Sequence, residues 1–292
     1  MTLLSLLQHI CEHPLNRNRK TGAILDFIRW QVQSRLTDKA VVYPWIGDAR
    51  VLVRRGETGF TMNIYSGLYD FSEMAYLLHT LRPGNLFADV GANIGSYTLL
   101  ASAVCHARSI CFEPIPSTFS RLEKNLQLNH LENLVIPKNL GVGDKSGIIR
   151  FSLNENCCNH VLREDEKEKG LEVKVITLDE ILGNDCPNLI KIDVEGFEQP
   201  VLKGARGILQ DPTLHSIILE LNGNDSGYGY QASDTIDLLK HYGFASYAYD
   251  PFQRKLTQRE PVPGNVIFIR HLDKVEALLR TSEKFQIKNI LI

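Results

Sequence analysis

The chain has 292 residues, of which 43% are hydrophobic, and its formal net charge at pH 7 is −2. This composition supports a buried core, but the charge lacks both the basic excess of a nucleic-acid-binding domain and the polybasic cluster that anionic membranes attract. No apolar stretch reaches the length of a membrane span, the start lacks the features of a signal peptide, and the six cysteines match no zinc or disulfide pattern. We therefore expect a cytoplasmic protein with neither nucleic acid nor a membrane among its partners.

The first part of the chain, residues 1–66, is expected to form an extension of helices and a hairpin. Leu3, Leu7 and Ile10 recur at helical spacing near the start. The pattern further predicts helices within 1–40, strands at 49–54 and 60–65 joined by the turn 56–59, and then a helix at 72–81.

From residue 85 the pattern alternates between apolar strands and amphipathic helices, which is typical of a parallel sheet covered by helices. The predicted strands are at 86–90, 109–113, 134–138, 188–193 and 215–221, and the predicted helices at 96–105, 117–129, 198–209 and 232–241. Two further strands, 147–153 and 171–177, flank a polar segment at 154–170. The final extended runs, 244–249 and 265–270, are expected to pair antiparallel.

The most informative stretch is residues 87–95, where a buried strand carrying an acid, Asp89, leads into a glycine turn and a helix start at Ser96. Glycine lets a cofactor lie directly on the backbone. The next strand ends in a second acid, Glu113, and two such acids suit the ribose of a nucleoside cofactor. Asn93 stands where a nicotinamide-binding turn would carry its middle glycine, which argues against a dinucleotide.

Several motifs together carry a family resemblance. They are D-V-G-A-N-I-G-S-Y-T at 89–98, F-E-P at 112–114, T-L-D at 177–179 and L-I-K-I-D-V-E-G-F-E at 189–198. In this order they resemble the FkbM family of S-adenosylmethionine-dependent methyltransferases, over roughly residues 65 to 222.

The resemblance implies an α/β class I methyltransferase fold, a Rossmann-like sheet of seven strands with the last one antiparallel. The methyltransferase domain would occupy residues 67–292, after the extension at 1–66. The implied reaction is O-methylation of a hydroxyl on a sugar or natural-product small molecule. S-adenosyl-L-methionine would be the cofactor and S-adenosyl-L-homocysteine the product, and a divalent metal is possible but not predicted.

The residues expected to bind the cofactor lie on or near these motifs. Asp89 would reach the methionine ammonium, Asn93 the carboxylate, and Glu113 both ribose hydroxyls. A ring from Tyr69 or Tyr97 could face the sulfonium. The full expected set is Glu73, Asp89, Gly91, Ala92, Asn93, Gly95, Tyr97, Glu113, Asn139, Gly141 and Asp193.

The expected catalytic residues are Asp193, Glu195 and His160. Asp193 and Glu195 follow the fourth strand, and Glu220 is expected at the same sheet edge, where open α/β sheets bind ligands. One carboxylate could deprotonate the acceptor hydroxyl, or several could hold a metal that lowers its pKa. The alternative is that Asp193 positions the cofactor and Glu195 caps the next helix. His160, in the polar segment, is a further candidate base.

Two other function classes remain open at this point. One is an NAD(P)-dependent oxidoreductase on a similar sheet, and the other is a cofactor-binding protein without turnover. The sequence leaves the identity of the acceptor and the oligomeric state undetermined.

Overall fold

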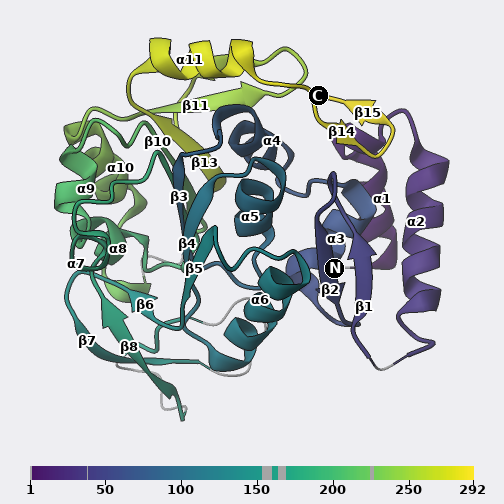
Figure 1. Ribbon diagram of the computed structural model, residues 1–292, viewed down its shortest axis with the longest axis horizontal. Helices are drawn as coiled ribbons and strands as arrows, with labels where there is room; N and C mark the ends of the chain where they lie inside the picture. The colour runs from purple at the N-terminus through teal and green to yellow at the C-terminus, as the bar shows by residue number, and fades with distance from the viewer. Residues whose placement is uncertain (1, 38, 153–159, 164–168, 224–226) are drawn as a thin grey trace.

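The computed structural model describes residues 2–37, 39–152, 160–163, 169–223 and 227–292. Its centre is one mixed sheet with helices on both faces (Figure 1). The strands are β3 (Leu86–Val90), β4 (Arg108–Phe112), β5 (Val135–Lys138), β9 (Leu189–Ile192), β10 (Ser216–Leu221), β11 (Ala245–Asp250), β12 (Lys255–Gln258) and β13 (Gly264–Ile269).

The order across the sheet is β12-β11-β13-β10-β9-β3-β4-β5. The run from β10 to β5 is parallel, and β13 pairs antiparallel with both β10 and β11. The expected seven-stranded class I sheet with an antiparallel last strand is therefore confirmed. The short polar strand β12 adds an eighth strand at the edge, which the sequence pattern did not indicate.

The helices bury both faces of the sheet, which explains why its strands read as continuous apolar runs. On one face Phe87 and Ile218 pack with α4 (Phe71–Thr80), the π-helical turn η2 (Leu100–Val104) after α5 (Ser96–Leu99), and α11 (Leu272–Thr281). On the other face Ala88 and Ile217 pack with α7 (Leu178–Leu182), α8 (Glu198–Lys203), α9 (Arg206–Gln210) and α10 (Ala232–His241).

A second, three-stranded sheet lies beside the carboxyl ends of the main strands. It has the order β6 (Gly141–Val142), β8 (Leu171–Ile176) and β7 (Gly147–Phe151), and the predicted strands at 147–153 and 171–177 are its antiparallel pair. Of the polar segment expected at 154–170, residues 160–163 and 169–170 belong to the described part of the chain. Val161 there bridges to Phe151.

The N-terminal part contains α1 (Leu3–Glu12), α2 (Lys20–Gln33), the hairpin β1 (Val41–Pro44) and β2 (Arg50–Val53), and α3 (Thr58–Ser66). The prediction of a strand at 60–65 was wrong, because this segment is α3. Phe60, Met62 and Ile64 alternate as in a strand, but Phe60 and Ile64 are also one helical turn apart and are both buried. The partner of β2 is β1.

The N-terminal part shares a hydrophobic cluster with the main sheet. Val51 and Phe60 pack together with Ile94, Leu122 and Val135. These three come from the glycine turn at 91–95, the expected cofactor turn, from α6 (Pro116–Leu128) and from β5. The hairpin is also hydrogen-bonded to α6, since Leu52 N donates to Asn125 Oδ1 over 2.8 Å. The division at residue 66 stays a prediction about domain boundaries.

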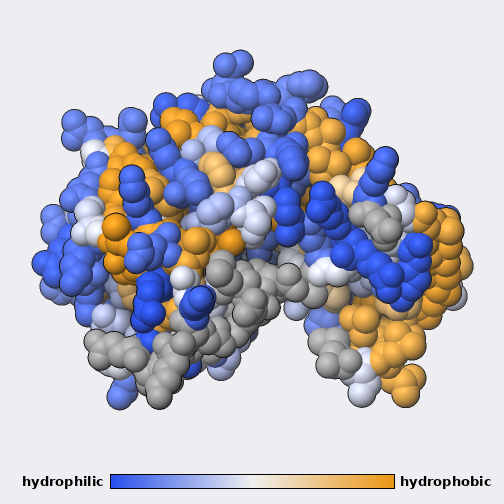
Figure 2. Space-filling model, turned by 90° about the horizontal axis from the view of Figure 1, so that it is seen from below, coloured by the Kyte–Doolittle hydropathy of each residue, from blue (hydrophilic) through white to orange (hydrophobic). Residues whose placement is uncertain are grey.

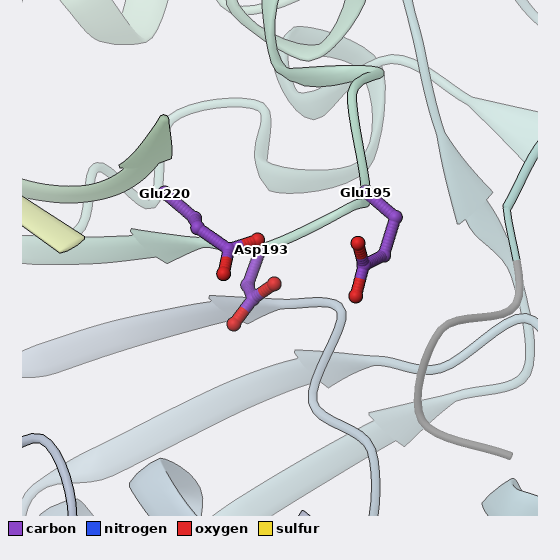
Figure 3. A group of neighbouring side chains, drawn as sticks. All are labelled: Asp193, Glu195 and Glu220. Carbon is purple, nitrogen blue, oxygen red and sulfur yellow. The ribbon is translucent and has the colours of Figure 1, made fainter. Parts of the chain in front are cut away.

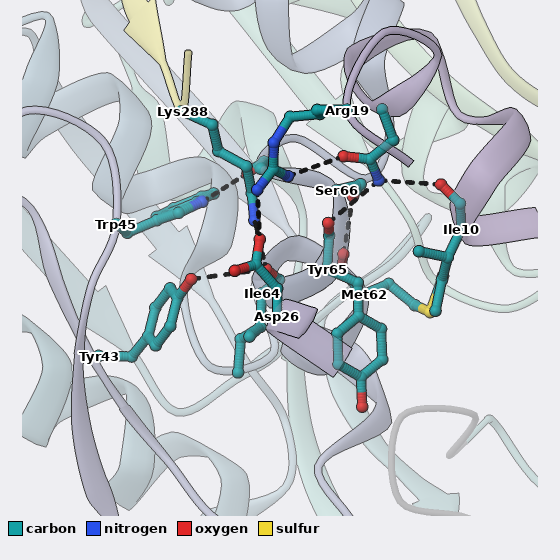
Figure 4. Close-up of polar contacts among 12 residues, drawn as sticks. Ile10, Arg19, Asp26, Tyr43, Trp45, Met62, Ile64, Tyr65, Ser66 and Lys288 are labelled. Atoms are coloured by element: carbon teal, nitrogen blue, oxygen red, sulfur yellow. Dashed lines mark hydrogen bonds and ion pairs between the residues drawn. The ribbon is translucent and has the colours of Figure 1, made fainter. Parts of the chain in front are cut away.

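The C-terminal hairpin, formed by β14 (Gln286–Ile287) and β15 (Ile290–Leu291), contacts two helices of the N-terminal part through Lys288 (Figure 4). Between these strands, Lys288 Nζ lies 2.6 Å from Asp26 Oδ2 on α2 and 2.8 Å from the carbonyl oxygen of Ile64 on α3. Arg19 pairs with the same carboxylate over 2.8 Å. The ammonium is thus a bridge between helices that are far from it in sequence. No described helix has the length and apolarity needed to cross a membrane.

Substitution of Lys288 with alanine tests this bridge. The free energy of unfolding should fall by about 2 kcal/mol, since hydrogen bonds to charged groups are worth roughly 1.5–3 kcal/mol. Chemical denaturation measures the loss, and Lys284→Ala, on the same segment and exposed, is the control. Equal stability of both variants would show that the bridge contributes nothing.

Candidate active site

A cavity of about 250 Å³ lies at the carboxyl ends of β3, β4, β9 and β10. This is where parallel α/β sheets bind ligands, because the loops after the strands converge there. Its wall includes Asp89, Glu113, Asp193 and Glu220 from the strand ends, with Gly59 contributed by α3. Residues from the sheet edge, the N-terminal part and the second sheet therefore meet around one space.

The glycine turn after β3 follows the predicted course, with the backbone of Gly91, Ala92 and Asn93 lining the cavity. Gly91 has φ +84°, and a Cβ there would lie 1.8 Å from the carbonyl oxygen of Asp193, so only glycine fits. Gly95 lies outside the cavity lining. A Cβ at Gly95 would lie 2.6 Å from Leu122 Cδ1, so this glycine lets the turn pack on α6.

The two acids of the first motifs are buried at the cavity. Asp89 Oδ2 accepts a hydrogen bond from Thr98 Oγ1 over 2.6 Å. The Glu113 carboxylate accepts from the backbone N–H groups of Asn93 at 3.0 Å and Ile115 at 2.9 Å. Burial raises the pKa of Asp89 to about 6 and that of Glu113 to about 7. Both groups are thus held rigidly, in surroundings that favour a ligand able to donate hydrogen bonds or bring positive charge.

Of the other residues expected to bind the cofactor, some line the cavity and others lie outside its lining. Gly141 lines the cavity, whereas Asn139 is exposed and lies outside the lining. The Asn139 amide donates to the carbonyl oxygens of Glu113 at 2.8 Å and Pro114 at 3.0 Å, so it fixes the turn after β4. Glu73, in the first turn of α4, also lies outside the lining, and burial raises its pKa to about 7.

The ring of Tyr97 is buried at the cavity wall, but its cationic partner is already within the protein. Lys191 Nζ lies 5.4 Å from the ring centroid, and the Tyr97 hydroxyl donates to Asp70 Oδ2 over 3.0 Å. Tyr69 also lines the cavity and is 44% exposed. Of the two rings suggested for the sulfonium, Tyr69 is therefore the freer one.

The acids after β9 and on β10 converge as predicted (Figure 3). Each of Asp193, Glu195 and Glu220 offers one oxygen, and these oxygens lie within 4.8 Å of one another. Asn222 Nδ2 donates to Glu195 Oε2 and Glu220 Oε2, both over 3.0 Å, and so links two of them. Glu195 has φ +55°, a backbone conformation that is uncommon for glutamate and is found at functional turns.

Glu198 organises the turn between β9 and the next helix. Helix α8 begins at Glu198, and it is Glu198 Oε1 that accepts hydrogen bonds from the N–H groups of Val194 at 3.2 Å and Gly196 at 3.1 Å. This closed turn leaves the Glu195 side chain in the cavity wall. The helix-capping role of Glu195 stays a prediction that these hydrogen bonds do not support.

Lys191 is the functional residue that sequence reasoning missed. It is 1% exposed, and its Nζ contacts Asp193 Oδ2 at 3.1 Å and Asn265 Oδ1 at 2.8 Å. Burial acts to lower its pKa, but the carboxyl groups of Asp193, Glu220 and Asp70 outweigh burial and raise it. The available signal was a lysine inside the apolar strand L-I-K-I, because a buried ammonium needs charged partners.

Asp193 and Glu220, the acids beside Lys191, have different charge states. Desolvation opposes ionisation of Asp193, but the Lys191 ammonium and the hydrogen bonds from Glu220 and Lys191 together lower its pKa. Burial, followed by the charge on Asp193, raises the pKa of Glu220 to about 9. At neutral pH the pair therefore consists of an ionised Asp193 and a protonated Glu220.

The structure does not bring His160 into the cavity wall. The backbone N–H of His160 donates to Ser152 Oγ over 3.1 Å, and its carbonyl oxygen accepts from the Ser152 N–H over 2.9 Å. Its neighbour Val161 is the residue that lines the cavity. A role for His160 as base stays a prediction without support from this arrangement.

The protonation of Glu220 has a measurable consequence for stability. Its pKa is about 9 in the folded protein, against 4.5 for an ordinary glutamate, so the folded state binds the extra proton between these values. Stability should therefore fall as pH rises from about 4.5 to about 9. Glu220→Gln mimics the protonated form and should remove this part of the pH dependence. Parallel slopes of unfolding free energy against pH in both proteins would contradict the assignment.

Comparison with known proteins identifies relatives of this chain. The sequence profile of the methyltransferase FkbM domain matches residues 89–246. The hexuronic acid methyltransferase AglP of Haloferax volcanii is 33% identical over 166 residues, 56% of this chain and 64% of the relative. The 31-O-demethyl-FK506 methyltransferase FkbM of Streptomyces tacrolimicus is 26% identical over 219 residues, 61% of this chain and 80% of the relative. The solved precorrin-6y C5,15-methyltransferase of Geobacter metallireducens has a TM-score of 0.42 and 13% identity, over 69% of this chain and 87% of that one.

The chain thus spans less than two thirds of the Haloferax relative. The profile nevertheless covers more than half of this chain, from Asp89 at the cofactor turn to Ser246 in β11, and it includes Glu113 and the acidic edge. The resemblance seen in the motifs is confirmed, and the chain belongs to the FkbM family of methyltransferases.

Proposed function

We propose that this protein transfers a methyl group from S-adenosylmethionine to a hydroxyl oxygen of a sugar or a natural-product small molecule. The observation that carries the proposal is that a single cavity brings together the two cofactor acids, Asp89 and Glu113, and the three acids at the ends of β9 and β10. The residues that would bind the nucleoside and the candidate base therefore line the same cavity.

The residues at the first two strand ends fit this cofactor. Asp89 would hold the cationic methionine ammonium, and Glu113 would accept the ribose hydroxyls with the oxygen lone pairs that the backbone N–H groups leave available. Gly91 lets the turn after β3 lie close to the backbone of Asp193, and Gly141 lines the cavity next to the second sheet. When bound, the cofactor supplies an electrophilic methyl group, so the protein has only to orient the acceptor and remove its proton.

The three acids would have separate roles in that step. Asp193 is neutralised by Lys191 and hydrogen-bonded by Glu220, which makes it a weak base and a good positioning group for the cofactor or the acceptor. Glu220 is protonated at neutral pH and cannot accept a proton. Glu195 is thus our candidate for the general base toward the acceptor hydroxyl.

A divalent metal is the alternative way to activate the hydroxyl, and three carboxyl groups are suitable ligands for one. Lys191, however, already offsets the charge of Asp193, one of the three acids. We therefore propose a reaction without metal.

The class of acceptor is proposed from the relatives. One is named for a hexuronic acid and another for 31-O-demethyl-FK506, so polyhydroxylated small molecules are the first acceptors to test. The acids that converge at the ends of β9 and β10 suit an acceptor rich in hydroxyl groups.

The cofactor assignment predicts the effect of Glu113→Ala. Hydrogen bonds to a charged group contribute roughly 1.5–3 kcal/mol each, so affinity for S-adenosylhomocysteine should fall by at least about tenfold. Isothermal titration calorimetry measures this, with NAD as the ligand expected not to bind. NAD binding without a response to S-adenosylhomocysteine would instead support an oxidoreductase. Cofactor binding without turnover on any acceptor would support a binding protein.

The base assignment predicts a different outcome for Glu195→Gln. Turnover of an accepted sugar should fall by roughly 10²–10⁴-fold, the usual contribution of a general base, while affinity for S-adenosylhomocysteine is unchanged. Asp185→Asn, an exposed acid away from the cavity, is the matched control. Treatment with a chelator should leave turnover intact. Loss of activity on chelation, restored by magnesium, would establish a metal in place of the base.

A further inference from the structure

Helix α2 is apolar on two opposite faces. Ala23 and Trp30 are buried against the protein, whereas Leu25, Ile28 and Val32 are 60%, 49% and 53% exposed. The last three residues are spaced by three and four positions, so they form one stripe on the solvent side of the helix. An outer helix of a monomer normally presents polar residues there.

Other exposed apolar residues lie on or just after the N-terminal helices. Leu3 and Leu4 on α1 are 61% and 80% exposed, and Leu36, just after α2, is 81% exposed. Figure 2 shows hydrophobic residues gathered along the side of the molecule where the N-terminal helices lie. We call these six residues, Leu3, Leu4, Leu25, Ile28, Val32 and Leu36, the outer apolar face. Exposed apolar patches of this kind mark binding surfaces.

The outer apolar face has a cationic surround. Residues 1–40 hold six Lys and Arg against three Asp and Glu, although the whole chain has a net charge of −2. Five of the six cations are exposed, and none of the five forms an ion pair with a carboxylate of the described residues. They are Arg17, Lys20, Arg29, Arg35 and Lys39.

We infer that the outer apolar face docks on the surface of an anionic lipid bilayer. Helices that lie in a membrane interface combine an apolar stripe with flanking Lys and Arg, which here would insert leucine side chains while the cations meet lipid headgroups. A second copy of the chain is the less favourable occupant, because a two-fold contact would bring this cationic surround against itself. The sequence expectation of no membrane partner rested on the charge of the whole chain, which hides the local excess.

Docking leaves the active site free. None of the six residues of the outer apolar face lines the cavity, and α2 packs on α3, which supplies Gly59 and Asn63 to the cavity wall. The inference is thus independent of the methyl-transfer proposal, and variants of the face should keep full affinity for S-adenosylhomocysteine.

Vesicle co-sedimentation of the full chain tests the inference. We expect binding to vesicles of equal parts phosphatidylcholine and phosphatidylserine, and no binding to phosphatidylcholine alone. The triple variant Leu25→Gln, Ile28→Gln, Val32→Gln should lose at least tenfold in partitioning. Lys20→Gln and Arg29→Gln should each reduce it about fivefold, the effect of roughly 1 kcal/mol per cation near the surface.

The control is the double variant Ile136→Gln, Ile148→Gln, which changes side chains that are 56% and 64% exposed elsewhere. It should bind anionic vesicles as the unchanged protein does. Unchanged thermal unfolding of the triple variant shows that it folds. Absence of vesicle binding, or equal binding by the triple variant, would overturn the inference. A dimer that the triple substitution dissociates, without vesicle binding, would assign the face to a second copy.

Discussion

The active site depends on one ammonium group buried at the edge of the sheet. Lys191 lies on β9, which pairs in parallel with β3 on one side and β10 on the other, and its Nζ lies within hydrogen-bonding distance of Asp193 and Asn265. The ammonium stabilises the ionised form of Asp193 in these buried surroundings, next to a protonated Glu220. The lysine therefore keeps a negative charge at the point where two ligands would meet.

That arrangement gives residues of similar chemistry different roles. Asp193 stays ionised beside the ammonium, whereas burial and the charge of Asp193 keep Glu220 protonated. Glu195 accepts a hydrogen bond from Asn222 on a strained turn and lines the cavity. In the proposed reaction, environment rather than residue type would separate the positioning group from the group that accepts the proton.

The N-terminal part contributes residues to the cavity wall and also carries the outer apolar face. Helix α3 contributes Gly59 to the cavity wall. The preceding strand, β2, shares a hydrophobic core with α6 and the cofactor turn. Lys288 then ties α2 and α3 to the C-terminal hairpin. The outer side of α2 is the proposed docking surface. The inner side of α2 contacts α3, which lines the cavity.

The sequence by itself determined the sheet and most of the cofactor site, because strand alternation and the acids Asp89 and Glu113 at strand ends are local patterns. Tertiary structure decided the rest. Residues 60–65 fit a strand and a helix equally well, and only packing against the main sheet selected α3. The role of Lys191 depends on Glu220 and Asn265, which are distant in sequence and adjacent only across strands β9, β10 and β13. A charge state set by such neighbours exists only after the strands have paired, so no local pattern could contain it.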